Sequence, residues 1–118
     1  MHLQHTYYIF DEVFYLKLQG DFIGLSEEKK ILSLIDTYLS QSFRKFVLDL
    51  SKINHINSAG LSYLVRMLNR VRKQKGLLVL KQPSKQVVKL LEITKLLGLC
   101  TLADTKEEIH YILAHTNY

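Results

Sequence analysis

The sequence contains one cysteine, one proline and no tryptophan, and it has no long hydrophobic run. Without a second cysteine, Cys100 can form neither an internal disulfide nor a CxxC pair for redox chemistry or zinc binding. Its apolar neighbours indicate a small buried side chain. No stretch approaches the roughly 18 consecutive apolar residues that a membrane span requires. The first residues also lack the basic start, apolar run and cleavage site of a signal peptide, so we expect a cytoplasmic protein with no membrane insertion.

The sequence also lacks the common signatures of enzymes. It has no GxGxxG, GxxxxGK[ST], HExxH or GxSxG motif. Its five histidines have no metal-ligand spacing, since even His110 and His115 are five positions apart and fall on different sides of a helix. Asp49 has no second carboxylate nearby in sequence with which to form an acid/base pair. We therefore predict no catalytic residue, no metal site and no cofactor, and we favour a binding role over an enzyme.

The net charge of +5 is spread along the chain. The densest basic group is Arg66, Arg70, Arg72, Lys73 and Lys75. We interpret this group as a solvated helix face, with contact to an acidic partner as the alternative. A nucleic-acid interface is not expected.

The hydrophobic pattern predicts strands that alternate with helices. Residues 6–10 and 13–18 are rich in β-formers and are separated only by Asp11-Glu12, which predicts a hairpin. Ser26 is the expected N-cap of a first helix. The remaining expected elements are helices over about 27–40, 58–75, 85–97 and 105–115, and short apolar strands at 46–50, 77–80 and 99–102.

Helices that alternate with short apolar strands require crossover connections and a largely parallel sheet. We therefore predict one α/β domain over residues 1–118, with its core at about 6–115. It should have a mixed sheet of four to five strands, antiparallel in the N-terminal hairpin and largely parallel elsewhere, packed with about four helices. The 47% hydrophobic and 23% charged content is typical of such a globular domain.

The most informative segment runs from the end of the strand at 46–50 to the start of the next helix. The strand ends in Asp49-Leu50-Ser51, a polar loop follows, and Asn57-Ser58 opens the helix. Asn and Ser are both good N-caps, and Gly60 allows a close approach to the first turn. On this basis alone, Ser58 is interpreted as a helix cap.

The run VLDLSKINHINSAGLSYLVRMLNRVRKQKGLLVLKQPSKQVVKLLEITKL resembles the central half of a STAS domain, the sulphate transporter and anti-sigma factor antagonist family. That family's pattern is a strand ending in Asp-Leu-Ser, a loop, Asp-Ser-Ser/Ala/Thr-Gly-Leu, a long helix, Gly, a strand, and a helix ending in Leu-x-x-Thr-x-Leu. The resemblance covers about residues 13–115. The residues in register are Gly20, Asp49, Ser58, Gly60, Leu61, Gly76, Leu91, Thr94 and Leu96 or Leu97.

The resemblance implies a protein-binding switch. In bacterial anti-sigma factor antagonists, the serine at the position of Ser58 is phosphorylated by a histidine-kinase-like serine kinase that is also the anti-sigma factor. The unphosphorylated form binds this kinase and releases the sigma factor, so phosphorylation ends the binding. Ser58 is thus the expected phosphoacceptor. Because loops after parallel strands leave the sheet at one edge, the expected partner-binding residues are Gly20, Asp21, Phe22, Ile23, His55, Ile56, Asn57, Ser58, Ala59, Gly60 and Ser62.

Two alternatives stay open. Asn57 replaces the Asp that usually precedes the phosphorylated serine in the family. STAS domains that serve as unphosphorylated interaction subunits of transporters or signalling scaffolds depart more freely from this motif, so Asn57 favours that alternative. Some STAS domains hold small ligands, but here only Gly20 and Gly24 suggest a ligand loop.

Overall fold

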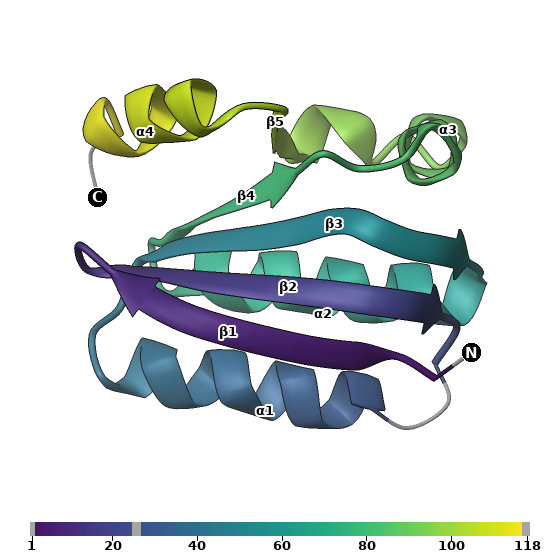
Figure 1. Ribbon diagram of the computed structural model, residues 1–118, viewed down its shortest axis with the longest axis horizontal. Helices are drawn as coiled ribbons and strands as arrows, with labels where there is room; N and C mark the ends of the chain where they lie inside the picture. The colour runs from purple at the N-terminus through teal and green to yellow at the C-terminus, as the bar shows by residue number, and fades with distance from the viewer. Residues whose placement is uncertain (1, 25–26, 117–118) are drawn as a thin grey trace.

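The computed structural model describes residues 2–24 and 27–116, so the predicted N-cap Ser26 lies outside the described residues. The sheet order is β1-β2-β3-β4-β5, with β1 and β2 antiparallel and every later pair parallel. The predicted mixed α/β fold is confirmed (Figure 1). In chain order the described elements are β1 (Gln4–Phe10), β2 (Val13–Phe22), α1 (Glu27–Ser40), β3 (Lys45–Ile56), α2 (Ser58–Lys73), β4 (Leu77–Lys81), α3 (Lys85–Ile93), the 3-10 turn η1 (Leu97–Leu99), β5 (Thr101–Ala103) and α4 (Lys106–Ala114).

The hairpin turn is made of two residues with left-handed backbone conformation. Phe10 pairs with Val13, and the intervening Asp11 and Glu12 have φ values of 51° and 65°. This geometry belongs to the two-residue turn whose twist matches that of the flanking strands. The predicted hairpin is confirmed, although neither turn residue is a glycine.

Strand β3 is longer than the predicted strand at 46–50, because it continues through the segment predicted to be a loop. The extension pairs with the end of β2, where Asp21 lies opposite His55 and Phe22 lies opposite Ile56. Ile53 and Ile56 are buried within it, whereas the polar residues between them are exposed. Irregular β2–β3 pairing near Gly20 accommodates this uneven spacing of buried residues.

Helix α2 ends before the predicted stop at Gly76. The left-handed residue is Lys75, with a φ of 62°, and the backbone N–H of Gly76 donates to the carbonyl of Val71 over 2.9 Å. Lys75 donates to Arg72 over 2.9 Å, which completes a Schellman turn. Gly76 is needed for a different reason, since a Cβ there would lie 2.7 Å from the Arg44 carbonyl oxygen.

Helix α3 is also shorter than predicted. It ends at Ile93, and Lys95 takes the left-handed conformation with a φ of 62°. Residues 97–99 then form the turn η1, so β5 begins at Thr101 and not at position 99. The predicted helix from position 105 is confirmed as α4, whose N-cap Thr105 accepts a hydrogen bond from the Glu108 backbone.

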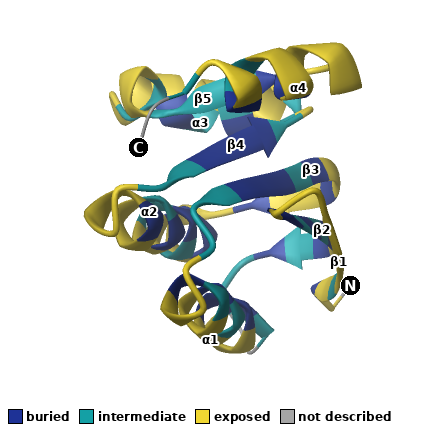
Figure 2. Ribbon diagram, turned by 90° about the vertical axis from the view of Figure 1, so that its left-hand side faces the viewer, coloured by how far each residue is buried: buried dark blue, intermediate teal, exposed yellow. Residues whose placement is uncertain are grey.

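One face of the sheet, which we call the first face, carries the main core. Helices α1 and α2 pack on it, and α3 contributes Val87 and Leu91 to the same cluster (Figures 1 and 2). The largest fully buried side chains are Phe14, Leu18, Phe22, Ile31, Ile35, Phe46, Leu48, Leu50, Leu64, Met67, Leu80 and Leu91.

The opposite face, the second face, is only partly covered. There α4 packs Ile109 and Leu113 on a smaller cluster that includes Val47 and Val79. Beside it, no helix of residues 2–24 and 27–116 covers this face of the β1–β2 hairpin, and every residue of β1 except the half-buried His5 is exposed (Figure 2). Within the described ranges, no helix is long and apolar enough to cross a bilayer.

Candidate protein-binding site

The predicted partner-binding residues come from two segments that meet at one edge of the sheet. One is the end of β2 with the following loop, and the other is the end of β3 with the first turn of α2 (Figure 1). The pairing of Phe22 with Ile56 brings the two segments together. We call this surface the Ser58 edge, after the residue at its centre.

Asn57 is the N-cap of α2 and fixes this edge from two sides. Its side-chain oxygen accepts a hydrogen bond from the Gly60 backbone over 2.9 Å, and its side-chain nitrogen donates to the Ile23 carbonyl over 3.3 Å. Its backbone N–H donates to the Phe22 carbonyl over 3.4 Å. An aspartate could cap the helix equally well, but it could not donate to Ile23. The amide therefore joins the β2–α1 loop to α2 in a way that the family's usual carboxylate cannot.

Because Asn57 caps the helix, Ser58 is the first residue of α2 and not its cap. Its side chain is exposed, and within residues 2–24 and 27–116 its hydroxyl makes no hydrogen bond. In the same part of the chain, the backbone N–H groups of Ser58 and Ala59 have no acceptor either. The interpretation of Ser58 as a cap is thus wrong, and its hydroxyl is available at the positive end of a helix dipole.

The group that approaches the first turn of α2 is the chain's own backbone. A Cβ on Gly60 would lie 1.8 Å from the Phe22 carbonyl oxygen, so only glycine allows α2 to meet β2 here. Gly24, with a φ of 81°, is held in the same way against Ala59, whose Cβ would lie 2.6 Å from a Cβ on Gly24. These contacts position Ser58 on a rigid frame.

The predicted partner-binding residues divide into an exposed group and a supporting group. Asp21 and Ile23 are half-buried. Gly20, Phe22, Ile56 and Gly60 are buried beneath the surface that a partner would reach. The exposed ones are His55, Asn57, Ser58, Ala59 and Ser62.

Sequence reasoning did not identify Glu28 as part of this edge. Its side chain is buried, and its carboxylate accepts a hydrogen bond from the Gly24 backbone over 2.5 Å. A carboxylate in the first turn of a helix is an ordinary sequence signal. Its contact with the β2–α1 loop could be seen only in the folded structure.

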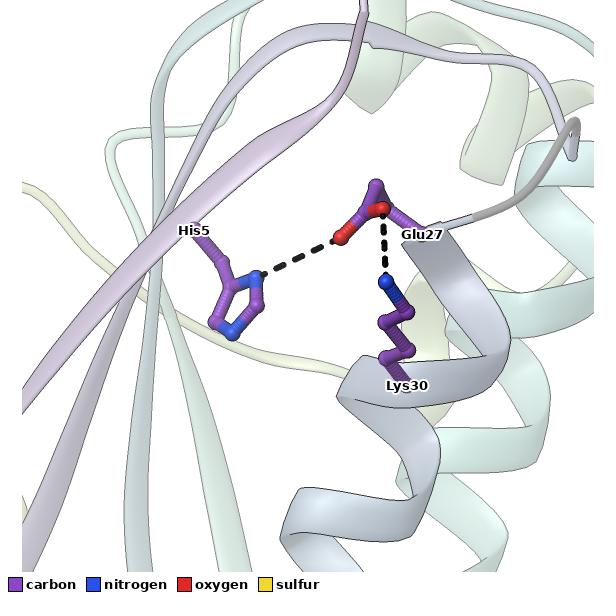
Figure 3. Close-up of polar contacts among 3 residues, drawn as sticks. All are labelled: His5, Glu27 and Lys30. Atoms are coloured by element: carbon purple, nitrogen blue, oxygen red, sulfur yellow. Dashed lines mark hydrogen bonds and ion pairs between the residues drawn. The ribbon is translucent and has the colours of Figure 1, made fainter.

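A second polar group lies on the flank, between β1 and the start of α1. The Glu27 carboxylate lies 4.0 Å from Nδ1 of His5 and 3.4 Å from the Lys30 ammonium (Figure 3). This contact could not be predicted from spacing, because His5 and Glu27 are separated by the whole hairpin. It fastens β1 to the helix that begins beside the Ser58 edge.

The basic group on α2 makes several contacts within the chain. Arg70 pairs with Asp36, Arg72 donates to the Leu99 carbonyl over 3.1 Å, and the Arg66 guanidinium lies 5.0 Å from the Tyr63 ring centroid. Three of the cations predicted to form a solvated face therefore contact other groups of the chain.

Neither metal nor thiol chemistry is indicated by the part of the chain that the structure describes. It holds no group of three or more His, Cys, Asp or Glu side chains placed to share a metal ion. Burial raises the pKa of the Cys100 thiol, and the charge of Arg72 opposes this only in part. A thiol with a raised pKa is a poor nucleophile at neutral pH. Cys100 is only half-buried at the edge of the main cluster, and not buried as predicted.

Comparison with solved structures places this fold among known ones. The structure of TM1081 from Thermotoga maritima superposes with a TM-score of 0.84 at 23% identity, covering 94% of this chain and 95% of that one. The anti-sigma factor antagonist SpoIIAA in its unphosphorylated form gives 0.72 at 15% identity, covering 98% and 100%. A sulfate transporter family protein from Wolinella succinogenes gives 0.70 at 14% identity, covering 92% and 93%. At these identities the likeness shows a shared fold.

The sequence itself matches the STAS domain family over residues 6–109. This range includes β2 to β5, all of β1 except its first two residues, and all of α1, α2 and α3. It also contains the whole Ser58 edge. The chain therefore belongs to the STAS domain family.

Proposed function

We propose that this STAS domain is an anti-sigma factor antagonist that binds a partner anti-sigma kinase through the Ser58 edge and is released when Ser58 is phosphorylated. In this role it acts in the cytoplasm by binding, and it is not an enzyme. The observation that carries the proposal is the exposed, unbonded hydroxyl of Ser58 at the first position of α2. SpoIIAA, whose fold this chain shares, is known in a phosphorylated form as well.

The local structure is suited to receive a phosphate. A phosphoserine carries about −1.5 to −2 charges at neutral pH. At the start of a helix such an anion is stabilised by roughly 0.3–2 kcal/mol, because the first N–H groups and the helix dipole point towards it. The backbone N–H groups of Ser58 and Ala59, which have no acceptor among the described residues, are placed to supply this stabilisation. The modified domain should therefore stay folded.

The same charge is unfavourable at a protein interface. A dianion buried without a counter-charge costs several kcal/mol, because it loses its water. This cost exceeds the gain at the helix end. Phosphorylation of Ser58 should therefore weaken partner binding while leaving the fold intact.

The second candidate is a permanent interaction subunit of a transporter or scaffold, and the hydrogen bond from Asn57 to Ile23 favours it. Asn57 stands where the family usually has an aspartate, whose carboxylate a kinase could use in recognition. Its hydrogen bond also holds the loop beside Ser58 in place. The fold is nearly as similar to that of the sulfate transporter family protein as to that of SpoIIAA. In this case Ser58 would be an exposed surface residue without a switching role.

An affinity capture from the native host separates the two candidates. Wild type, Ser58→Ala and Ser58→Asp would be used as baits, with proteins identified by mass spectrometry. Ser33→Asp serves as the matched control, because Ser33 is an exposed serine on α1 outside the Ser58 edge. We expect wild type, Ser58→Ala and Ser33→Asp to capture a histidine-kinase-like ATPase, and Ser58→Asp to lose it.

The captured kinase would then be incubated with the domain and ATP. Incorporation of one phosphate into wild type, and none into Ser58→Ala, is the expected result. Equal capture of transporter or scaffold subunits by all four baits would reject the switch in favour of the permanent subunit. A loss of cooperative melting in Ser58→Asp would contradict the claim that the fold tolerates the charge.

A further inference from the structure

The uncovered part of the second face contains a cavity of about 300 Å³. It lies over β1, β2, β3 and the end of β4, and its lining shares no residue with the Ser58 edge. The side chains that matter to its chemistry are Thr6, Tyr8, Tyr15, Lys17, Asp49 and Lys81.

The polar side of this cavity is a row of charges across three neighbouring strands. Lys17 of β2 is the register partner of Asp49 of β3, which is in turn the partner of Lys81 of β4. The Lys81 ammonium lies 3.8 Å from one carboxylate oxygen of Asp49, and the other oxygen accepts a hydrogen bond from the Ser51 backbone over 2.9 Å. Asp49 is therefore already engaged through both oxygens.

Lys17 has no such partner. Lys17 is half-buried, and among the described residues its ammonium makes no ion pair or hydrogen bond. The row of two lysines and one aspartate thus carries a net charge of +1, with one ammonium free to meet an anion. A partly desolvated, unpaired ammonium attracts an anion more strongly than one in bulk water does.

The other side of the cavity is aromatic. The rings of Tyr8 and Tyr15 are stacked, with centroids 4.7 Å apart and planes 6° from parallel. Tyr15 is half-buried, whereas Tyr8 is 57% exposed, so the stack stands at the rim of the cavity. Burial, together with the nearby Tyr8 and Asp11, raises the pKa of Tyr15, whose hydroxyl stays protonated and able to donate at neutral pH.

We propose that this cavity binds a small planar anion, an aromatic ring that carries one carboxylate or phosphate group, with the ring against Tyr8 and Tyr15 and the anionic group on Lys17. The volume lies at the lower end of ligand sites and suits a single ring. Flat aromatic walls favour a flat ligand, because stacked rings pack at van der Waals distance. The site is independent of the switch proposed at Ser58.

Amide NMR of the ¹⁵N-labelled protein tests this site with four probes. Phenyl phosphate and benzoate carry both a ring and a charge, benzyl alcohol carries only the ring, and inorganic phosphate carries only the charge. We expect the two aromatic anions to cause saturable shifts at Tyr15, Lys17 and Asp49, with affinities at least about tenfold higher than those of the other two probes. The stronger of the two anions then identifies the preferred charged group.

Three variants assign the binding to the named side chains. Lys17→Gln should lower the affinity for the more tightly bound aromatic anion about tenfold, and Tyr8→Leu should lower this affinity several-fold. Lys89→Gln removes an exposed lysine on α3 and should leave the affinity unchanged. Each variant would first be shown to melt cooperatively.

Three results would overturn the proposal. The first is the absence of saturable shifts with either aromatic anion. The second is binding of inorganic phosphate as tight as that of phenyl phosphate, which would show an unspecific anion contact. The third is an unchanged affinity in both Lys17→Gln and Tyr8→Leu, because the ligand would then bind elsewhere.

Discussion

The two faces of the sheet differ in how completely helices cover them and in how many large side chains they bury. On the first face, α1, α2 and α3 cover one continuous core, and glycines let backbones meet directly, as where Gly60 meets the Phe22 carbonyl. On the second face, α4 covers a small cluster of short side chains. The hairpin beside it exposes Tyr8 and Phe10 by 57% and 63%.

This difference separates stability from binding. Burial of apolar side chains is the main source of stability, at roughly 25 cal/mol per Å², and most of the large buried side chains lie on the first face. The second face and the Ser58 edge carry the side chains proposed to bind, among them Tyr8, Lys17 and Ser58. Substitutions on the first face should therefore affect folding, and those on the second face should affect binding.

The largest expected effect comes from the same substitution made on both faces. Leu64 of α2 is completely buried in the main core, whereas Leu113 of α4 is 5% exposed in the smaller cluster. We expect Leu64→Ala to lower the free energy of unfolding by about 3–5 kcal/mol, because the rigid surroundings leave a cavity. Leu113→Ala should lower it by only about 2 kcal/mol, because α4 can shift to close the space.

Urea denaturation followed by circular dichroism measures both values. The size of the Leu64 effect is a large part of the stability of a typical domain, so its midpoint should move clearly. Equal losses in the two variants would show that the two faces contribute alike to the stability of the fold.

The next effect tests the close contact beneath the Ser58 edge. In Gly60→Ala, the added Cβ would lie 1.8 Å from the Phe22 carbonyl oxygen, so α2 must move away from β2. We expect a loss of about 2–3 kcal/mol in the free energy of unfolding. Thermal melting by circular dichroism checks this value.

Gly98→Ala is the matched control for that substitution. Gly98 lies in η1, and a Cβ there would meet nothing within 4 Å. Its free energy of unfolding should stay within about 1 kcal/mol of wild type, since Gly→Ala at a compatible site has a small effect through the unfolded state. A large loss in both variants would mean that the backbone of Gly60 is not specially constrained.

The pattern of the sequence was sufficient to predict the fold, because short apolar strands and amphipathic helices alternate along it. The segment 51–56 was wrongly predicted to be a loop, because its two apolar residues, Ile53 and Ile56, are three positions apart and do not follow the two-residue period of a strand. Helix ends were also misplaced, because the left-handed positions hold Lys75 and Lys95 in place of glycine. The residues at these positions therefore carried no sequence signal for a left-handed turn.

Ser58, at the centre of the candidate site, was predicted from the sequence, but the contacts that its neighbours make were not. The resemblance located Ser58, whereas the structure shows that Asn57 does the capping and bonds to Ile23. Contacts across 34 positions cannot be inferred from spacing. The cavity on the second face was missed for the same reason, since Lys17, Asp49 and Lys81 become neighbours only through strand register.

A smaller effect is expected on the second face. Tyr8→Ala removes the outer ring of the stack with Tyr15 and should lower the free energy of unfolding by about 1 kcal/mol. Ile9→Ala, on the same strand but on the side of the first face, removes a similarly exposed apolar side chain and serves as the control. If Tyr8→Ala destabilised the protein as much as Leu64→Ala does, the second face would be part of the main core and not a binding surface.

The smallest expected effect is a gain in stability at a helix end, where the two faces of the sheet also differ. The helices α1, α2 and α3 all end in Schellman turns whose left-handed position is held by Ser42, Lys75 or Lys95, with φ values between 62° and 72°. The end of α4 shows no positive φ within the described residues, since its C-cap His115 has a φ of −109°. Among the helix ends of the described residues, a side chain in the left-handed region therefore occurs only on the helices of the first face, where the large core can sustain the strain.

Lys75→Gly should relieve this strain at α2 and raise the free energy of unfolding by about 0.5–1 kcal/mol, because glycine adopts the left-handed conformation without a Cβ clash. Lys73→Gly, at the last residue of α2, should instead lower it by roughly 0.5–1 kcal/mol, because glycine loses more backbone freedom in the helical conformation. Both lysines are exposed, so the two variants change the net charge equally and differ only in backbone conformation. Paired urea titrations should therefore show shifts of opposite sign. Shifts of the same sign would mean that the turn after α2 is not under the strain that its φ value implies.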